Sequence, residues 1–138
     1  MECCPVRKHN EIVPGTIHKS GEDYLEAILI LHLSKGTVRS VDVADFLQYS
    51  RPSVCNAVSV LCQAGHLRMD ADHSLTLTDQ GRAIAERIYE RHCFFTDFLT
   101  AIGVDKGIAE RDACQIEHCI SEESFRKLKG MLEKYADL

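Results

Sequence analysis

The sequence lacks several features that would each define a class of protein. Its longest unbroken apolar run, Ala27 to Leu31, is five residues long, whereas a helix that crosses a bilayer needs about 20. The opening segment MECCPVRKHNEIV contains no apolar stretch, so we expect neither a secretory signal nor a membrane partner, and we expect a cytoplasmic protein. No internal repeat or low-complexity tract is visible.

An excess of positive charge and the common catalytic motifs are also missing. The formal net charge is -5, which argues against a surface that is basic throughout but leaves room for a local basic face. We find no nucleophile motif, no glycine-rich phosphate loop and no acid/base pair beyond the candidate ligands below. The sequence therefore predicts neither an enzyme nor a small-molecule substrate.

What the chain does contain is typical of a folded protein. Over 138 residues, 45% are apolar and 27% charged, which suits one domain or two small subdomains. Seven cysteines are a high and odd number. Without an export signal we expect thiols rather than disulfides. Apart from Cys114, discussed below, we expect the cysteines of the ordered region to be small packing residues: Cys55, Cys62, Cys93 and Cys119.

The first half predicts a helix-turn-helix. Residues 1–19 show no periodicity and are predicted to form a flexible arm. Ser20 and Asp23 form a capping-box pattern, so we expect the first helix to begin at Ser20. A short helix from Ser40 and a second one over residues 51–65, with Pro52 in its first turn, are separated by a turn of three residues.

The next segment predicts a wing and then only helices. Apolar residues alternate on both sides of the polar turn over 70–73, which is typical of a β-hairpin. A long helix follows from Thr78 to about Ile102, then two more over roughly 106–120 and 122–136. The predicted fold class is mainly α, with a winged helix-turn-helix over 20–81 followed by an all-helical region over 82–138.

The helix that begins at Arg51 favours DNA binding. Residues 34–68 contain four Lys and Arg against two Asp, a local charge of 4 - 2 = +2. Ser53, Asn56 and Ser59 share one helical face, where short polar side chains suit phosphates and base edges. The alternative is a protein-interaction module with a solvated face. We favour DNA because helix, turn, helix and wing occur in that order.

A second pattern favours a metal. Cys114, Glu117 and His118 have the spacing i, i+3, i+4, which places them on one helical face, and all three are ligand types for transition metals.

Two further groups are weaker when taken alone. His92 lies in the apolar stripe of the long helix, where a histidine is usually a core residue. Asp23 and Glu26, near the start of the first helix, suit a cap and a solvated face. Together with the Cys/Glu/His face, these groups are able to hold one or two divalent ions, although periodicity does not show that they converge.

Several segments resemble one family in sequence and in order. GEDYLEAILIL, SVDVADFLQYSRPSVCNAVSVLCQAG, LTLTDQG, ERHCFF and IEH are similar to the metal-dependent repressors of the diphtheria-toxin-repressor and manganese-transport-regulator family, over about residues 20–136. The resemblance implies a homodimeric repressor of metal-ion homeostasis that binds palindromic double-stranded operators when Fe²⁺ or Mn²⁺ is bound. It makes 82–138 the metal-binding and dimerisation domain, without the SH3-like domain of longer members.

The resemblance also implies site residues. The implied metal ligands are Asp23, Glu26, His92, Cys114, Glu117 and His118. The DNA contacts that it implies come from the helix that starts at Arg51, including Ser50, Pro52, Ser53 and Asn56, and from the wing. The local positive charge and the shared helical face add Arg39 and Ser59 to the expected DNA contacts.

The ligand set departs from both branches of the family. Cys114 stands where the manganese branch generally has a carboxylate and the iron branch a cysteine, whereas Asp23 and Glu26 match the manganese branch. A thiolate favours softer metals and carboxylates favour Mn²⁺. Fe²⁺ and Mn²⁺ therefore both stay open as the regulatory metal, and Zn²⁺ is possible because Cys114 and His118 suit it.

An alternative function needs no metal. A winged-helix regulator is able to sense redox state through Cys93 with Cys114 or Cys119. In the interpretation we prefer, metal instead ties the first helix to the later helices and thereby sets the spacing of two winged helices in a dimer.

Overall fold

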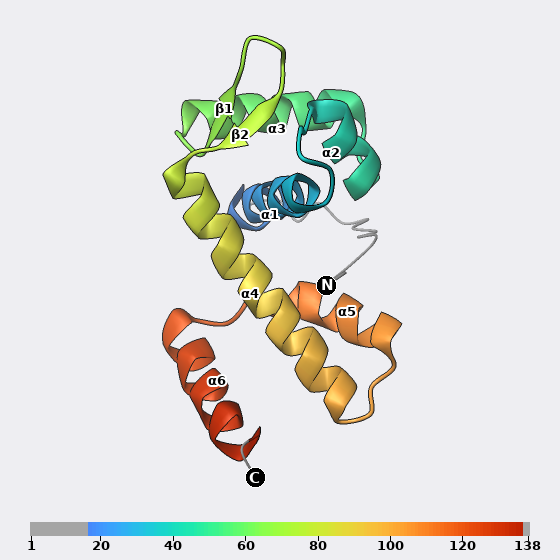
Figure 1. Cartoon of the computed structure of the whole chain (residues 1–138), viewed down its shortest axis with the longest axis vertical. Coiled ribbons are helices and arrows are strands. Elements are labelled where there is room, and N and C mark those ends of the chain that lie inside the picture. The colour runs from blue at the N-terminus through green and yellow to red at the C-terminus, as the bar shows by residue number, and fades with distance from the viewer. Residues whose placement is uncertain (1–16, 137–138) are drawn as a thin grey trace. The chain divides into compact units, whose positions relative to one another are not determined.

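The computed structural model describes residues 17–136 (Figure 1). The described residues divide into two compact units, one up to Tyr89 and one from Glu90 onward, and each is described by itself. The predicted domain boundary between residues 81 and 82 stays a prediction. Most of the predicted N-terminal arm lies outside the described residues. No helix among those described is long and apolar enough to cross a membrane.

The first unit has the predicted order of elements, with a hairpin that extends beyond α3 in Figure 1. The hairpin is followed by the first turns of α4. The elements are α1 (Ile17–Lys35), α2 (Ser40–Leu47), α3 (Arg51–Gln63), β1 (Leu67–Met69), β2 (Leu75–Leu77) and α4 (Asp79–Ala101).

The beginning of α1 differs from the prediction. The helix starts at Ile17, so Ser20 lies inside it and the expected capping box at Ser20 is wrong. A cap contributes only about 1 kcal/mol, and adding residues to an existing helix needs no new nucleus. A local capping pattern therefore does not stop a helix from extending past it.

A lysine and a capping carboxylate hold α2 in place. The Asp42 carboxylate accepts a hydrogen bond from the Arg39 backbone N–H (2.8 Å) and pairs with the Lys35 ammonium (2.6 Å). The bond from Lys35, and then the bond from Arg39, lower the pKa of Asp42 from its ordinary value. Asp42 thus links the end of α1 to the beginning of α2.

The turn between α2 and α3 follows from local chemistry. Gln48 adopts a left-handed conformation (φ 59°) that ends α2. Ser50 is the N-cap of α3, and its hydroxyl accepts a hydrogen bond from the Ser53 backbone N–H (3.3 Å). Pro52 has no N–H to satisfy in this first turn. The predicted turn over residues 48–50 and the predicted start of α3 are confirmed.

One apolar core holds the first unit together. Side chains from α1, α2, α3 and both strands meet there, and each large one that is fully buried contributes on the order of 1.5–3 kcal/mol. Its fully buried members include Leu25, Ile28, Val38, Val43, Leu47, Val54, Val58 and Leu75. Because α3 gives only one face to this core, its other face stays exposed.

The wing is attached to the segment before α2. Its antiparallel strands pair Leu67 with Leu77 and Met69 with Leu75. The Leu75 N–H donates to the Val38 carbonyl (2.7 Å), and His32 Nε2 lies 2.9 Å from the Leu75 carbonyl oxygen. These two bonds connect β2 to α1 and to the residues that follow it.

The first turn of α4 passes very close to the connection between α3 and β1. A Cβ added at Gly81 would lie 2.0 Å from the His66 carbonyl oxygen. The same oxygen accepts a hydrogen bond from the Thr78 N–H (3.2 Å). Glycine is therefore needed here for close approach of two backbones.

The second unit contains the rest of α4, α5 (Lys106–Ile116) and α6 (Glu122–Ala136). In Figure 1, α5 and α6 lie on opposite sides of α4. Phe94 and Phe95 of α4 both contact Phe125 of α6 through their rings, at centroid distances of 5.3 and 6.0 Å. Ser121 caps α6 by accepting a hydrogen bond from the Ser124 N–H (3.1 Å), as predicted.

Two predictions need correction. The helix expected over 106–120 ends at Ile116, so Glu117 is its C-cap and His118 lies in the following turn. The cysteines expected to be packing residues behave differently from one another. Cys62 and Cys93 are partly buried, but Cys55 and Cys119 are exposed, so the packing interpretation is wrong for these two.

The predicted fold class is confirmed: residues 17–136 are mainly helical, with a two-stranded wing after the helix-turn-helix and only helices from there to residue 136.

Candidate functional site

The outer face of α3 carries the residues predicted to contact DNA. Val54, Val58 and Leu61 are buried on its inner face. The predicted DNA-contact residues on α3 are all exposed: Arg51, Pro52, Ser53, Asn56 and Ser59. The helix therefore offers two hydroxyls, an amide and a guanidinium to the solvent, as a recognition helix requires.

Two predicted contact residues also serve the fold. Exposed Ser50 caps α3 and donates its hydroxyl proton to Ser53 Oγ (2.8 Å). Arg39 is exposed too, and its Nε donates to the Asp72 carbonyl at the tip of the wing (3.3 Å). The Arg39 guanidinium therefore lies between α2 and the wing, close to the elements expected to meet DNA.

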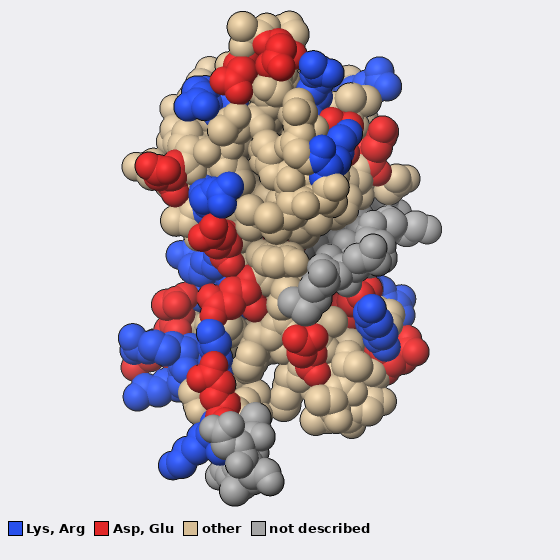
Figure 2. Space-filling view, viewed as in Figure 1, with Lys and Arg blue, Asp and Glu red and all other residues tan. Residues whose placement is uncertain are grey.

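The charges of the described residues are mixed. Figure 2 shows Lys and Arg side chains interspersed with Asp and Glu over the visible face. In the wing, hydrogen bonds from neighbouring side chains lower the pKa of both acidic residues: Thr76 and then Arg68 act on Asp70, and Ser74 acts on Asp72. On the face that Figure 2 shows, the first unit thus presents separate basic side chains rather than a continuous basic surface.

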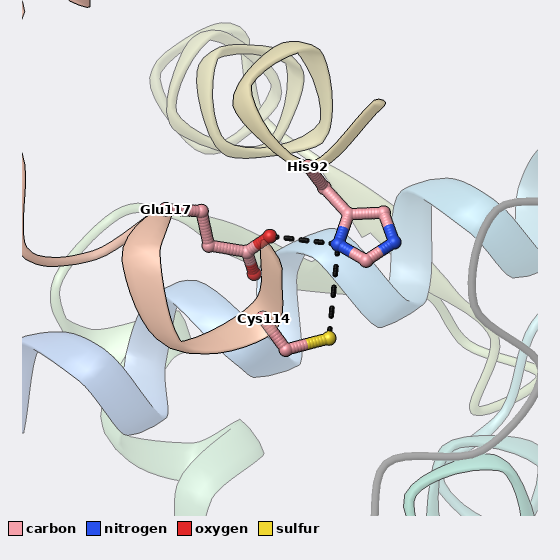
Figure 3. Close-up of side chains that lie close together, drawn as sticks. All are labelled: His92, Cys114 and Glu117. Carbon is pink, nitrogen blue, oxygen red and sulfur yellow. Dashed lines mark hydrogen bonds and ion pairs between the residues drawn. The ribbon is translucent and has the colours of Figure 1, made fainter. Parts of the chain in front are cut away.

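A buried polar cluster occupies the second unit (Figure 3). Nδ1 of His92 on α4 lies 2.9 Å from Glu117 Oε2 and 3.7 Å from Cys114 Sγ. The exposed fractions of His92, Cys114 and Glu117 are 0%, 4% and 0%. Since burying a carboxylate is costly unless it is paired, this cluster needs a positive partner or a proton.

His118 extends the cluster. Its Nε2 lies 3.2 Å from Glu117 Oε1, and its side chain is almost fully buried. The Glu117 carboxylate thus lies between two imidazoles, one from α4 and one from the turn after α5. Although α5 ends before Glu117, the Glu117 N–H still donates to the Ala113 carbonyl (3.0 Å), which keeps Glu117 on the same side as Cys114.

The donor set fits a divalent transition metal. One atom each from His92, Cys114 and Glu117 lies within 4.8 Å of the others. Ligand atoms at about 2.0–2.3 Å from a tetrahedral ion are on the order of 3–4 Å apart, so small adjustments suffice. An imidazole, a thiolate and a carboxylate together suit borderline ions such as Fe²⁺ or Zn²⁺ better than the hardest ones.

Asp23 and Glu26 belong to α1, in the first unit. Both are buried, so their interpretation as a cap and a solvated face is wrong. Burial, with the Asp23 carboxylate beside it, raises the pKa of Tyr24. Two buried carboxylates one turn apart on a helix are unusual for purely structural residues.

Sequence reasoning missed Arg91. This residue precedes His92 on α4, is buried, and donates to backbone carbonyls of the turn that contains Glu117 and His118. The sequence signal that could have identified it is a charged residue directly before a histidine in the apolar stripe of the long helix.

Comparisons with known proteins show which family the chain resembles in sequence and in fold. Residues 78–137 match the family model of the iron dependent repressor, metal binding and dimerisation domain. The chain is 31% identical over 121 residues to the uncharacterized HTH-type transcriptional regulator MJ0568 of Methanocaldococcus jannaschii, covering 86% of this chain and 97% of that protein. It is 33% identical over 114 residues to the HTH-type transcriptional regulator MntR of Lysinibacillus sphaericus, with 83% and 82% covered.

A solved structure shows the same fold. The metal-dependent transcriptional regulator MtsR superposes with a TM-score of 0.76 at 24% identity, covering 86% of this chain and 54% of that one. The chain thus spans about half the length of this structural relative.

A winged helix followed by a helical region with a buried His/Cys/Glu cluster defines a metal-dependent transcriptional regulator rather than an enzyme. The chain belongs to the diphtheria-toxin-repressor and manganese-transport-regulator family of iron-dependent repressors, as its sequence motifs predicted.

Proposed function

We propose that this protein is a homodimeric repressor of metal-ion homeostasis that binds a palindromic double-stranded operator when Fe²⁺ or Mn²⁺ occupies its metal site. The observation that carries the proposal is the buried cluster of His92, Cys114 and Glu117, because it lies inside the region matched by the metal-binding and dimerisation domain. Structural relatives described as a manganese regulator and as a manganese-dependent transcriptional repressor support a metal-responsive regulator.

Six side chains are proposed as metal ligands. His92, Cys114, Glu117 and His118 supply two imidazoles, a thiolate and a carboxylate. Asp23 and Glu26 are proposed as the remaining oxygen ligands. A bound ion would supply positive charge that these donors share, which offsets the cost of keeping their lone pairs out of water.

The choice of metal depends on Cys114. A thiolate there favours Fe²⁺ over Mn²⁺, whereas three carboxylates in one ligand set favour Mn²⁺. Zn²⁺ is the third possibility, since the manganese-activated repressor ScaR, a structural relative, has been solved with bound Zn²⁺ and since thiolate and imidazole are its usual ligands. Fe²⁺ and Mn²⁺ are the proposed regulatory ions.

The proposed DNA contacts lie on α3 and next to it. Asn56 is proposed to read a base edge, and Arg51 with the serines is proposed to contact phosphates. In a dimer, two such helices reach half-sites about 34 Å apart, one helical turn of DNA. Ligands on α1 and on the later helices give metal binding a means to restrict the positions of the two winged helices.

This mechanism is a linkage between two binding events. Each side chain that joins the metal site lowers the number of arrangements that the dimer samples, so less free energy is spent on ordering when DNA binds. A coupling of about 1–3 kcal/mol, or 5- to 150-fold in affinity, is usual for such effects.

Operator binding with and without metal tests the proposal. The protein is titrated onto a fluorescent duplex from the region upstream of its own gene, with chelator, Mn²⁺, anaerobic Fe²⁺ or Zn²⁺. We expect tight binding only with metal, and a weaker metal response in His118→Ala. Equal affinity under all four conditions contradicts metal dependence, and a full response in His118→Ala removes that ligand while leaving the DNA assignment intact.

The redox alternative is tested in the same assay. Thiols are counted before and after peroxide treatment of the metal-free protein while operator binding is followed. Loss or gain of binding that tracks thiol oxidation, without any effect of metal, would favour a cysteine sensor. We expect operator binding to follow metal rather than thiol oxidation.

A further inference from the structure

We infer that Arg91 is a positioning residue of the metal site: its buried guanidinium fixes the turn that carries Glu117 and His118 and thereby raises metal affinity. The inference rests on the proposed function, because it concerns the same ligands.

The contacts of Arg91 converge on that turn. Nη1 donates to the carbonyl oxygens of Ile120 (2.6 Å) and Glu117 (3.3 Å), and Nη2 donates to Glu122 Oε2 (2.7 Å). Only 5% of Arg91 is exposed. One side chain of α4 therefore bonds to the first residue of the turn, to its penultimate residue and to the beginning of α6.

The turn needs such a partner because α5 ends there. The last carbonyls of a helix have no partner within the helix, and α5 ends at Ile116, directly before Glu117. In the turn itself, the Cys119 N–H donates to the Ile116 carbonyl (2.9 Å). Arg91 donates to the carbonyls of Glu117 and Ile120, which come before and after His118 and Cys119, so the backbone at His118 is held from both directions.

Arg91 is itself held in place. Its Cζ lies 5.3 Å from the centroid of the Phe125 ring, a distance typical of a cation–π contact. The ring in turn packs against Phe94 and Phe95 of α4. The guanidinium plane therefore has a fixed support, and the bonds that it makes define one geometry of the turn.

Arg91 connects the two segments that supply these ligands, α4 and the turn after α5. His92 is the neighbour of Arg91 on α4, and neighbouring residues on a helix point about 100° apart. Thus His92 of α4 is itself a proposed ligand, and its neighbour Arg91 fixes the turn that carries Glu117 and His118. A site whose ligands are already oriented binds metal without a further ordering cost.

The charge of Arg91 has the opposite effect. A buried guanidinium near a cation site repels a cation, so if charge dominated, its removal would tighten metal binding. The positioning role predicts weaker binding on removal. The two explanations therefore predict opposite signs for the change in metal affinity when the charge of Arg91 is removed.

The test is an anaerobic Co²⁺ titration of the full chain, followed by the thiolate-to-cobalt absorption of Cys114, with affinity from competition against a chelator. Arg91→Lys keeps the charge but loses the planar fork, and Arg91→Gln loses both. We expect about 10-fold weaker Co²⁺ binding in each, the low end of the effect of residues that support metal ligands. Arg82→Lys, on the exposed part of α4, is the matched control and should bind as the wild type does.

A second readout does not involve metal. Hydrogen exchange in the metal-free protein should be faster at the amides of residues 117–121 in Arg91→Lys and unchanged in Arg82→Lys. Glu122→Gln, a change at an exposed residue, covers the case in which Arg91 variants do not fold. It should weaken Co²⁺ binding by about two- to fivefold, as expected for one ion pair of this kind, and speed the same exchange.

The outcomes separate the two proposals. Wild-type affinity and exchange in the folded variants, or tighter Co²⁺ binding in Arg91→Gln, overturn the role of Arg91 and leave the metal site standing. If the wild type itself binds no Co²⁺ and shows no thiolate absorption, the proposed function fails, and this inference fails with it.

Discussion

The outer face of α3 and the cluster around Glu117 look alike in the sequence and differ in the structure. Each is a set of polar residues at helical spacing. The α3 residues are exposed, so water satisfies them and their arrangement needs no ligand. The residues of the cluster are buried, so their arrangement has to be stabilised by protons, hydrogen bonds or a cation.

Burial therefore decides how much each pattern says about function. An exposed polar face is common on any helix, and its assignment to DNA depends on the fold around it. A buried group of ligand types is rare, and it indicates a site by itself.

Glu117→Ala should abolish metal binding by the buried cluster. We expect metal affinity to fall by more than about 100-fold, because residues that merely support ligands already account for 10- to 100-fold. Operator binding should then no longer respond to metal. Equilibrium metal titration measures the effect, with Glu123→Ala, an exposed acidic residue of α6, as control. Wild-type affinity in Glu117→Ala would mean that the cluster is only a buried hydrogen-bond network.

Asn56→Ala should weaken operator binding and leave stability and metal affinity unchanged. Loss of a base contact costs about 1–3 kcal/mol of operator binding, whereas the unfolding free energy and metal affinity should not change because Asn56 is exposed. Fluorescence anisotropy with operator and scrambled duplexes measures it, and Gln63→Ala at the exposed end of α3 is the control. An equal loss on both duplexes would assign Asn56 to the phosphate backbone rather than to a base.

Ser50→Ala should reduce stability by about 1 kcal/mol, because it removes the N-cap of α3. Urea unfolding of the metal-free protein measures this, and Ser50→Asp should restore most of it. Ser59→Ala, exposed on the same helix, should stay within about 0.5 kcal/mol of the wild type. Equal effects of Ser50→Ala and Ser59→Ala would show that the cap has no special role.

Asp42→Asn should change how stability depends on pH. The bonds from Lys35 and Arg39 lower the pKa of Asp42 in the folded state. Its contribution is therefore complete above the unfolded pKa, about 3.9, and is lost as the pH falls through the folded value. The stability difference between wild type and variant should shrink below about pH 4, measured by unfolding at several pH values. A difference that stays constant down to pH 2 contradicts this role.

Local signals were enough for much of the first unit. Ser50 and Pro52 mark the beginning of α3, and the alternation around residues 70–73 marks the wing, because each depends on neighbours in sequence. The capping pattern at Ser20 did not predict the start of α1. A cap contributes too little free energy to prevent a helix from beginning a few residues earlier.

The candidate site was predicted only in part. Ligand types and spacing suggested His92, Cys114 and Glu117, but their convergence depends on the packing of α5 against α4, which periodicity does not encode. The end of α5 at Ile116 and the contacts of Arg91 were missed because they depend on residues far apart in the sequence: Arg91 donates to the Glu117 carbonyl, 26 positions later in the chain.

The attachment of the wing determines how small a part of this domain can be transferred to another protein. Two strands of three residues each are too short to form a stable hairpin in isolation. Leu75 completes its backbone hydrogen bonding through Val38 and His32, which lie before α2. A transplant of residues 67–77 into another scaffold would lose these partners, so the smallest transferable unit extends from the last turn of α1 through β2.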